Sequence, residues 1–124
     1  MKQRISTYIQ GVFYIIAGIN HFINPEFYYS LIPDYFIFIV EFNAMAGFAE
    51  ILFGLLLFFT STRKFASYSI IVMLLIFITS HFFFIQQGSC IDDGLCVPQW
   101  IGWVRLVVIH PILVWWSWSV RNVW

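Results

Sequence analysis

Apolar residues form four long blocks along this chain, separated by short polar or proline-containing segments. Each block has about 20 residues, the length that an α-helix needs to cross the hydrocarbon core of a membrane. The blocks are Ile5–Ile23, Ile37–Thr60, Phe65–Ile85 and Trp100–Ser119. The pattern therefore predicts an all-α fold, with one four-transmembrane-helix bundle over residues 1–124.

The second block carries a stripe of small and polar residues. Asn43, Gly47, Glu50 and Gly54 fall at i, i+4, i+7 and i+11, which is one face of a helix. A charge near the bilayer centre costs about 2.5–3.5 kcal/mol on insertion scales. We therefore expect this face to contact protein and not lipid.

The first block has a comparable face. Gly11, Tyr14, Gly18 and His21 fall at i, i+3, i+7 and i+10, and small residues there would let another helix backbone come close. His21 lies near the end of the block. It can be a histidine at the membrane interface or part of a site.

Composition agrees with a membrane location. The chain is 61% hydrophobic and only 10% charged, whereas soluble proteins carry about 25% charged residues. The first block lacks a small-residue cleavage site and is expected to be retained. The few basic residues give no basis for a nucleic-acid partner.

Charge asymmetry predicts the orientation. Basic residues lie at both ends and in the second loop, where Ser61–Lys64 is expected to form a short turn. The charged residues of the first and third loops are all acidic. By the positive-inside rule, both termini are expected in the cytoplasm, beneath a bacterial-type inner membrane. The residues are Lys2, Arg4, Arg63, Lys64 and Arg121 on one side, and Glu26, Asp34, Asp92 and Asp93 on the other.

The first outer connection, Asn24–Phe36, is too short to cross the membrane and too apolar to leave it. Pro25 and Pro33 bracket its aromatic centre. We expect a short segment that lies at the interface or folds back as a lid. Its tyrosines fit an aromatic belt and a ligand contact equally well: Tyr28, Tyr29 and Tyr35.

The third loop contains both cysteines, Cys90 and Cys96. The outer compartment is oxidising, so a disulfide is the first expectation, with a redox-active pair or free thiols as alternatives. No second pair of cysteine or histidine residues lies in the loop to complete a four-ligand site, and no metal site is predicted.

The fourth block combines Arg105 with His110 and Pro111. Proline cannot donate to the carbonyl of Val107, which predicts a kink there. Arg105 and His110 are five residues apart, about 140° around an ideal helix, and would not point to the same place.

Every block contributes polar side chains that fall in the outer half or near the midplane, whereas the cytoplasmic half has few. Scattered ionisable groups would each be costly in lipid, so we expect one polar chamber open toward the outer side. Glu50 and Arg105 are the expected ion pair, although such a pair can also serve only to fix helix register. The residues are His21, Glu41, Asn43, Glu50, His81, Arg105 and His110.

Four of these residues are candidates for chemistry. His81 or His21 would accept a proton, and Glu50 would adjust the proton affinity of that histidine. Arg105 would hold an anionic group or oxygen. Asn43 and His110 are candidates for holding a cofactor, whose identity the sequence leaves open between a small oxidisable molecule and a quinone headgroup.

Several short motifs together resemble the DoxX-like family of small four-helix membrane proteins. They are GINHF followed by Pro25 and Pro33, Gly47-x-x-Glu50 with Gly54, Arg63, and Arg105 before a tryptophan-rich end. The resemblance implies a four-helix bundle with His21, Glu50 and Arg105 as recurrent polar positions. Thr79-Ser80-His81 and His110 depart from the family's pattern and put a shared reaction in doubt.

Two functions of different classes follow. The first is a redox-associated subunit, linked to quinone or thiol chemistry, whose chamber takes a small molecule from the outer side. The second is a non-enzymatic lipid-binding, small-molecule-binding or assembly protein, because the sequence has no phosphate loop, dinucleotide fingerprint or haem motif. Transport has little room in one four-helix unit. The expected partners are the bilayer, a small ligand, and another protein or a second copy.

Overall fold

The computed structural model describes residues 1–92 and 94–123, so Asp93, one of the acidic loop residues, lies outside the described part. The described residues contain no β-strand, only an isolated bridge between Cys90 and Cys96. The all-α prediction is confirmed. The elements are α1 (Lys2–Ile23), α2 (Pro25–Tyr29), α3 (Ile39–Leu56), α4 (Thr60–Gln86), α5 (Gln99–Val104), the π-helix η1 (Arg105–Ile109) and α6 (His110–Val120).

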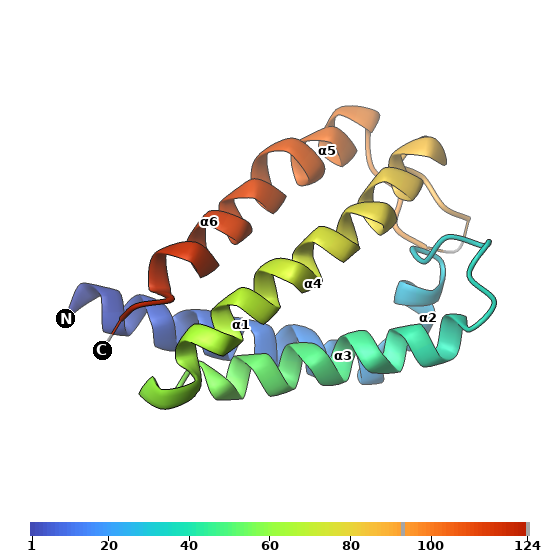
Figure 1. The fold of residues 1–124 in the computed structure, drawn as a ribbon. Coiled ribbons are helices and arrows are strands. Elements are labelled where there is room, and N and C mark those ends of the chain that lie inside the picture. The colour runs from blue at the N-terminus through green and yellow to red at the C-terminus, as the bar shows by residue number, and fades with distance from the viewer. Residues whose placement is uncertain (93, 124) are drawn as a thin grey trace.

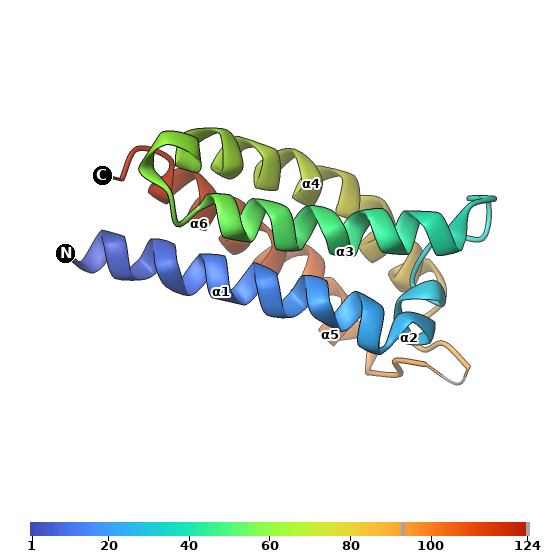
Figure 2. The same cartoon turned by 90° about the horizontal axis from the view of Figure 1, so that it is seen from below.

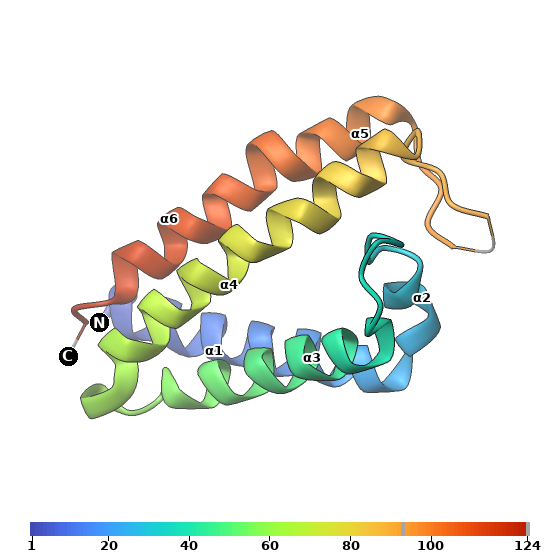
Figure 3. The ribbon, with the colours of Figure 1, turned by 45° about the vertical axis from the view of Figure 1, so that its right-hand side comes forward.

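The helices form two antiparallel pairs. The first pair is α1 with α3, and the second is α4 with the continuous rod of α5, η1 and α6 (Figures 1 and 2). The pairs meet at the end that carries both chain termini, called here the terminal end. They diverge toward the opposite end, called the loop end, where α2 and residues 30–38 fold back between them (Figure 3).

Glycines set the distance between α1 and α3. A Cβ atom added at Gly18 would lie 2.5 Å from the carbonyl oxygen of Gly47, and one added at Gly54 would lie 2.8 Å from that of Gly11. The two backbones therefore touch at two places, Gly18 with Gly47 and Gly11 with Gly54, which lie on the same face of each helix. The predicted faces of both helices are confirmed, since their glycines and polar residues are buried.

The turn between α3 and α4 differs from the prediction. It spans residues 57–59, and Ser61–Lys64 belongs to the first turn of α4. The side chains of this first turn bond back to the end of α3: the Thr62 hydroxyl donates to the Leu56 carbonyl oxygen at 2.8 Å. Such bonds satisfy carbonyls that have no partner within their own helix.

Arg63 is the main link at the terminal end. Its side chain is 1% exposed, and its Nε, Nη1 and Nη2 donate to the carbonyl oxygens of Leu57, Val123 and Phe58 at 2.8, 2.7 and 3.3 Å. The cation thus lies against the negative end of the α3 dipole. The sequence marked Arg63 as a topology signal and a family motif, and the structure shows that it also joins α3, α4 and Val123.

The terminal end also contains a polar network that the sequence did not predict. Gln10 Nε2 donates to Ser117 Oγ at 2.7 Å, and Trp116 Nε1 donates to Ser6 Oγ at 2.8 Å, so α1 and α6 are joined. The expectation that buried polar groups lie almost only in the outer half is wrong. Thr7, Gln10 and Tyr14 share one helical face, and this spacing was the available signal.

Three helical stretches among the described residues are long and apolar enough to cross a membrane. α1 is not among them, because polar residues interrupt it at both ends and near its middle. The prediction of four such helices is therefore supported for three, which are Ile39–Leu56, Thr60–Gln86 and Gln99–Val120. Their outer faces expose large apolar side chains, as a lipid-facing surface requires.

Gly18→Val should destabilise the bundle by about 1–3 kcal/mol, because the new side chain would overlap the Gly47 carbonyl and force α1 away from α3. Reversible unfolding in mixed detergent micelles measures the change. Ile16→Val is the matched control, since Ile16 is 62% exposed on the same helix. Equal stability of the two variants would contradict the close contact.

Arg63→Gln should lower the free energy of unfolding by about 3 kcal/mol, because three buried carbonyls lose a charged donor. The neighbouring Lys64→Gln changes an exposed side chain and should cost at most about 0.5 kcal/mol. A similar loss in both variants would show that charge at the terminal end, and not the Arg63 bonds, stabilises this turn.

Candidate functional site

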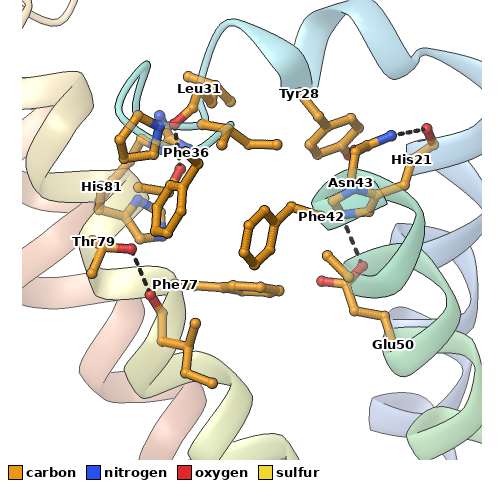
Figure 4. A pocket seen from close by; sticks show the side chains of 16 residues that line it. His21, Tyr28, Leu31, Phe36, Phe42, Asn43, Glu50, Phe77, Thr79 and His81 are labelled. Atoms are coloured by element: carbon orange, nitrogen blue, oxygen red, sulfur yellow. Dashed lines mark hydrogen bonds and ion pairs between the residues drawn. The ribbon is translucent and has the colours of Figure 1, made fainter. Parts of the chain in front are cut away.

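A cavity of about 210 Å³ lies at the loop end, where the two helix pairs diverge. α1, α2 and α3 form one wall, and α4 with η1 forms the other (Figure 4). Aromatic and aliphatic side chains line most of it, with polar side chains on each wall. The lining residues used below are His21, Tyr28, Leu31, Pro33, Phe36, Phe42, Asn43, Glu50, Ile76, Phe77, Thr79, Ser80, His81 and Arg105.

His21 is the centre of the first wall. Its Nε2 lies 3.2 Å from Glu50 Oε2, and its Nδ1 lies 2.7 Å from Asn43 Oδ1. Asn43 Nδ2 donates to the His21 carbonyl oxygen at 3.0 Å. All three side chains are nine-tenths or more buried. The α1 and α3 faces predicted from the sequence therefore meet in one polar cluster.

The Asn43 contacts fix the protonation pattern of this cluster. Since Asn43 Nδ2 is occupied as a donor, Asn43 Oδ1 must accept, and His21 Nδ1 must carry a proton. His21 Nε2 and Glu50 Oε2 then face each other across 3.2 Å and require one proton between them. The pair is either imidazolium with carboxylate or imidazole with carboxylic acid, and exchanging the two forms moves one proton.

Tyr28 of α2 covers this cluster. Its ring stacks on the His21 ring with centroids 3.8 Å apart, and its hydroxyl accepts from Asn20 Nδ2 at 2.6 Å. The loop tyrosines were expected either in an aromatic belt or in contact with a ligand. Tyr28 lies against the candidate site, whereas Tyr35 is 68% exposed. The connection Asn24–Phe36 folds back between the helix pairs, which agrees with the lid alternative, while its position at the membrane interface stays a prediction.

The second wall carries His81 of α4 and Arg105 at the start of η1. The Arg105 guanidinium lies 5.1 Å from the centroid of the Phe84 ring, and its Nη1 is buried without a hydrogen-bond partner. Ser80 Oγ donates to the Leu31 carbonyl oxygen at 2.7 Å, which ties the lid segment to α4.

The π-helix alters the predicted relation between Arg105 and His110. The His110 backbone N–H bonds to the Arg105 carbonyl oxygen five residues back, so this wider turn precedes Pro111 in place of a simple kink. His110 Nε2 donates to the Leu74 carbonyl oxygen at 2.5 Å, and its ring lies 4.8 Å from that of His81. His110 is buried behind His81 and does not line the cavity.

The predicted ion pair between Glu50 and Arg105 is wrong. Glu50 pairs with His21, and this is the only ion pair among the described residues. The two residues project from opposite walls, because Glu50 shares the α3 face that packs on α1. Glu41 is also outside the predicted chamber, since it is exposed in the first turn of α3.

The aromatic walls of the cavity were not predicted from the sequence. Phe36, Phe42 and Phe77 lie between the two polar walls (Figure 4). Phenylalanine is so common in this chain, with 15 copies, that no spacing distinguished these three. Only the divergence of the helix pairs selects them.

Cys90 and Cys96 form a disulfide in the loop before α5. No group of three metal-binding side chains occurs in residues 1–92 and 94–123. This disulfide lies at the loop end of the bundle, and neither cysteine lines the cavity.

A double-mutant cycle on unfolding in micelles tests this arrangement. His21→Ala and Glu50→Ala should show a coupling of about 1 kcal/mol, because the two side chains share one buried contact. Arg105→Ala and Glu50→Ala should be additive within about 0.5 kcal/mol. Stronger coupling of Glu50 to Arg105 than to His21 would contradict the assignment.

Comparison with known proteins corrects the family assignment. No curated protein and no solved structure matches the chain. The predicted resemblance to the DoxX-like family is wrong, because it depended on short motifs of small and polar residues that serve helix packing in many bundles. A different family model matches residues 11–121, which include the whole cavity. The chain belongs to the family described as Domain of unknown function (DUF8561).

Proposed function

We propose that this chain is an integral membrane protein with four crossings whose cavity binds a small, largely apolar molecule, or one end of a longer one. α1 is the fourth crossing in this proposal. Its 22 residues span about 33 Å at 1.5 Å per residue and run along α3. Its outer face exposes apolar side chains such as Ile9, Ile16 and Ile23.

The proposed orientation places both termini in the cytoplasm of a bacterial-type inner membrane. Lys2, Arg4 and Arg121 lie at the terminal end, while Glu26 and Asp34 lie at the loop end. The positive-inside rule therefore supports a cytoplasmic terminal end. Arg63 does not contribute to this charge asymmetry, because its charge is buried in the bundle.

The observation that carries the binding proposal is the cavity itself. It is walled by aromatic rings and has hydrogen-bonding groups on two facing walls, the arrangement typical of small-molecule sites. On the first wall, His21 Nε2 and Glu50 Oε2 form an ion pair at 3.2 Å, whereas Arg105 Nη1 on the second wall is buried with no acidic partner among the lining residues. Such a cavity orients a molecule that is apolar along its body and polar at an end.

A redox-associated role is the second candidate. The hydrogen-bonding groups face each other across aromatic rings, which suits a quinone with oxygens on opposite sides of its ring. The His21–Glu50 pair could exchange a proton with such an oxygen. In this reading the protein is the quinone-binding part of a larger assembly.

Purification from native membranes followed by solvent extraction and mass spectrometry tests the proposal. Wild-type protein should carry a stoichiometric apolar molecule. Phe77→Trp should reduce its amount by roughly tenfold, because a larger ring fills the cavity at a cost of about 1–3 kcal/mol.

Phe82→Trp is the matched control on the same helix, since Phe82 is 50% exposed and does not line the cavity. Equal retention by both variants would contradict binding in the cavity. Recovery of a quinone would support the second candidate, and recovery of another class of molecule would oppose it.

A further inference from the structure

We propose that the ligand is an amphipathic anion, whose acidic headgroup binds Arg105 beside His81 and whose apolar tail leaves between α3 and α4 into the bilayer. This inference depends on the proposed binding function. The headgroup chemistry is shared by the carboxylate of a fatty acid and the phosphate of a lysolipid.

Charge balance is the first argument. Glu50 is the only acidic side chain among the lining residues, and it pairs with His21 on the opposite wall. Arg105 keeps its proton in essentially any environment. The second wall therefore carries a positive charge with no acidic partner among the lining residues. Arg105 is partly buried and its Nη1 is fully buried, which makes an unpaired charge there costly. An anionic ligand supplies that partner.

The donors on the second wall are free for such a ligand. Arg105 Nη1 is buried and has no hydrogen-bond partner, while the centroid of the Phe84 ring lies 5.1 Å from the guanidinium carbon. His110 is committed to the Leu74 carbonyl, and its ring supports that of His81. The His81 side chain makes no hydrogen bond among the described residues and lines the same cavity as Arg105, so it can add a second donor. Two adjacent donors match an oxyanion with more than one oxygen.

Size and openings decide where the rest of the ligand goes. The cavity of about 210 Å³ is smaller than the roughly 300 Å³ of the smallest typical ligand pockets. The lid closes the loop end, since Leu31 and Pro33 are buried and Ser80 holds the Leu31 carbonyl. Phe42 of α3 and Ile76 of α4 line the cavity and are 41% and 62% exposed.

The opening therefore lies between α3 and α4, on a surface flanked by large apolar side chains. α3 and α4 are both long and apolar enough to cross a membrane. A headgroup that enters there comes from the bilayer, and its tail stays in contact with lipid. A water-soluble anion would have no such path, so the geometry selects an amphiphile.

The test uses the full chain in nanodiscs of neutral phosphatidylcholine, with the fluorescent fatty acid cis-parinaric acid and its methyl ester as probes. Wild-type protein should bind the acid roughly tenfold more tightly than the ester, because the ester cannot pair with Arg105. Arg105→Gln should remove this difference by weakening binding of the acid, and Arg105→Lys should retain part of it.

Arg121→Gln is the matched control, because Arg121 also lies over an aromatic ring, that of Trp118, but at the terminal end. It should leave the preference for the acid intact. Competition by lysophosphatidic acid identifies a site that also accepts phosphate, and failure to compete identifies a carboxylate site. Thermal melting of each variant confirms folding, and the wild-type comparison of acid with ester stands even if Arg105→Gln misfolds.

Equal affinity of the wild-type protein for acid and ester would overturn the anion assignment and leave the binding proposal standing. Binding of neither probe, together with an empty cavity on extraction, would overturn both. A preference for the acid that survives in Arg105→Gln would place the headgroup elsewhere and also overturn this inference.

Discussion

The close contact between the α1 and α3 backbones is the constraint on which the rest of the structure depends. Two reciprocal glycine contacts, Gly18 with Gly47 and Gly11 with Gly54, leave no room for side chains between these helices. This spacing brings His21 within reach of both Asn43 and Glu50. In a membrane, where apolar surfaces gain little by leaving lipid, such packing and polar contacts are what joins helices. The His21 cluster is thus both a helix link and one wall of the cavity.

The buried cations at the two ends of the bundle differ in their hydrogen-bond partners. At the terminal end, Arg63 is satisfied by three carbonyl oxygens, and Gln10 bonds to Ser117. These bonds join the helices at this end, although Gln10 Oε1 and Ser67 Oγ are also buried without a hydrogen-bond partner. At the loop end, Arg105 retains a buried donor without a partner. An unsatisfied buried donor costs free energy unless something binds it. Arg105 differs from the unpaired groups at the terminal end because it carries a charge and lines the cavity.

The lid and the π-helix shape the cavity from opposite sides. Tyr28 stacks on His21, while Ser80 holds the lid segment at Leu31. Across the cavity, the wide turn of η1 places Arg105 one turn from His110, so that Arg105 lines the cavity and His110 supports His81 from behind. Pro111 follows directly and cannot continue the ordinary hydrogen-bond ladder. A local irregularity in one helix therefore decides which polar side chain reaches the site.

The sequence by itself determined the all-α class, the approximate helix positions and the buried faces of α1 and α3, because hydrophobic periodicity and glycine spacing act along one helix. It also singled out His21, Asn43, Glu50, His81 and Arg105 as polar residues too costly for lipid. It could not determine which of them meet. Glu50 pairs with His21 and not with Arg105, since partner choice depends on the rotation and divergence of whole helices. Only the tertiary structure turned two polar faces toward each other across a row of phenylalanines, because that gap exists only where the two helix pairs separate.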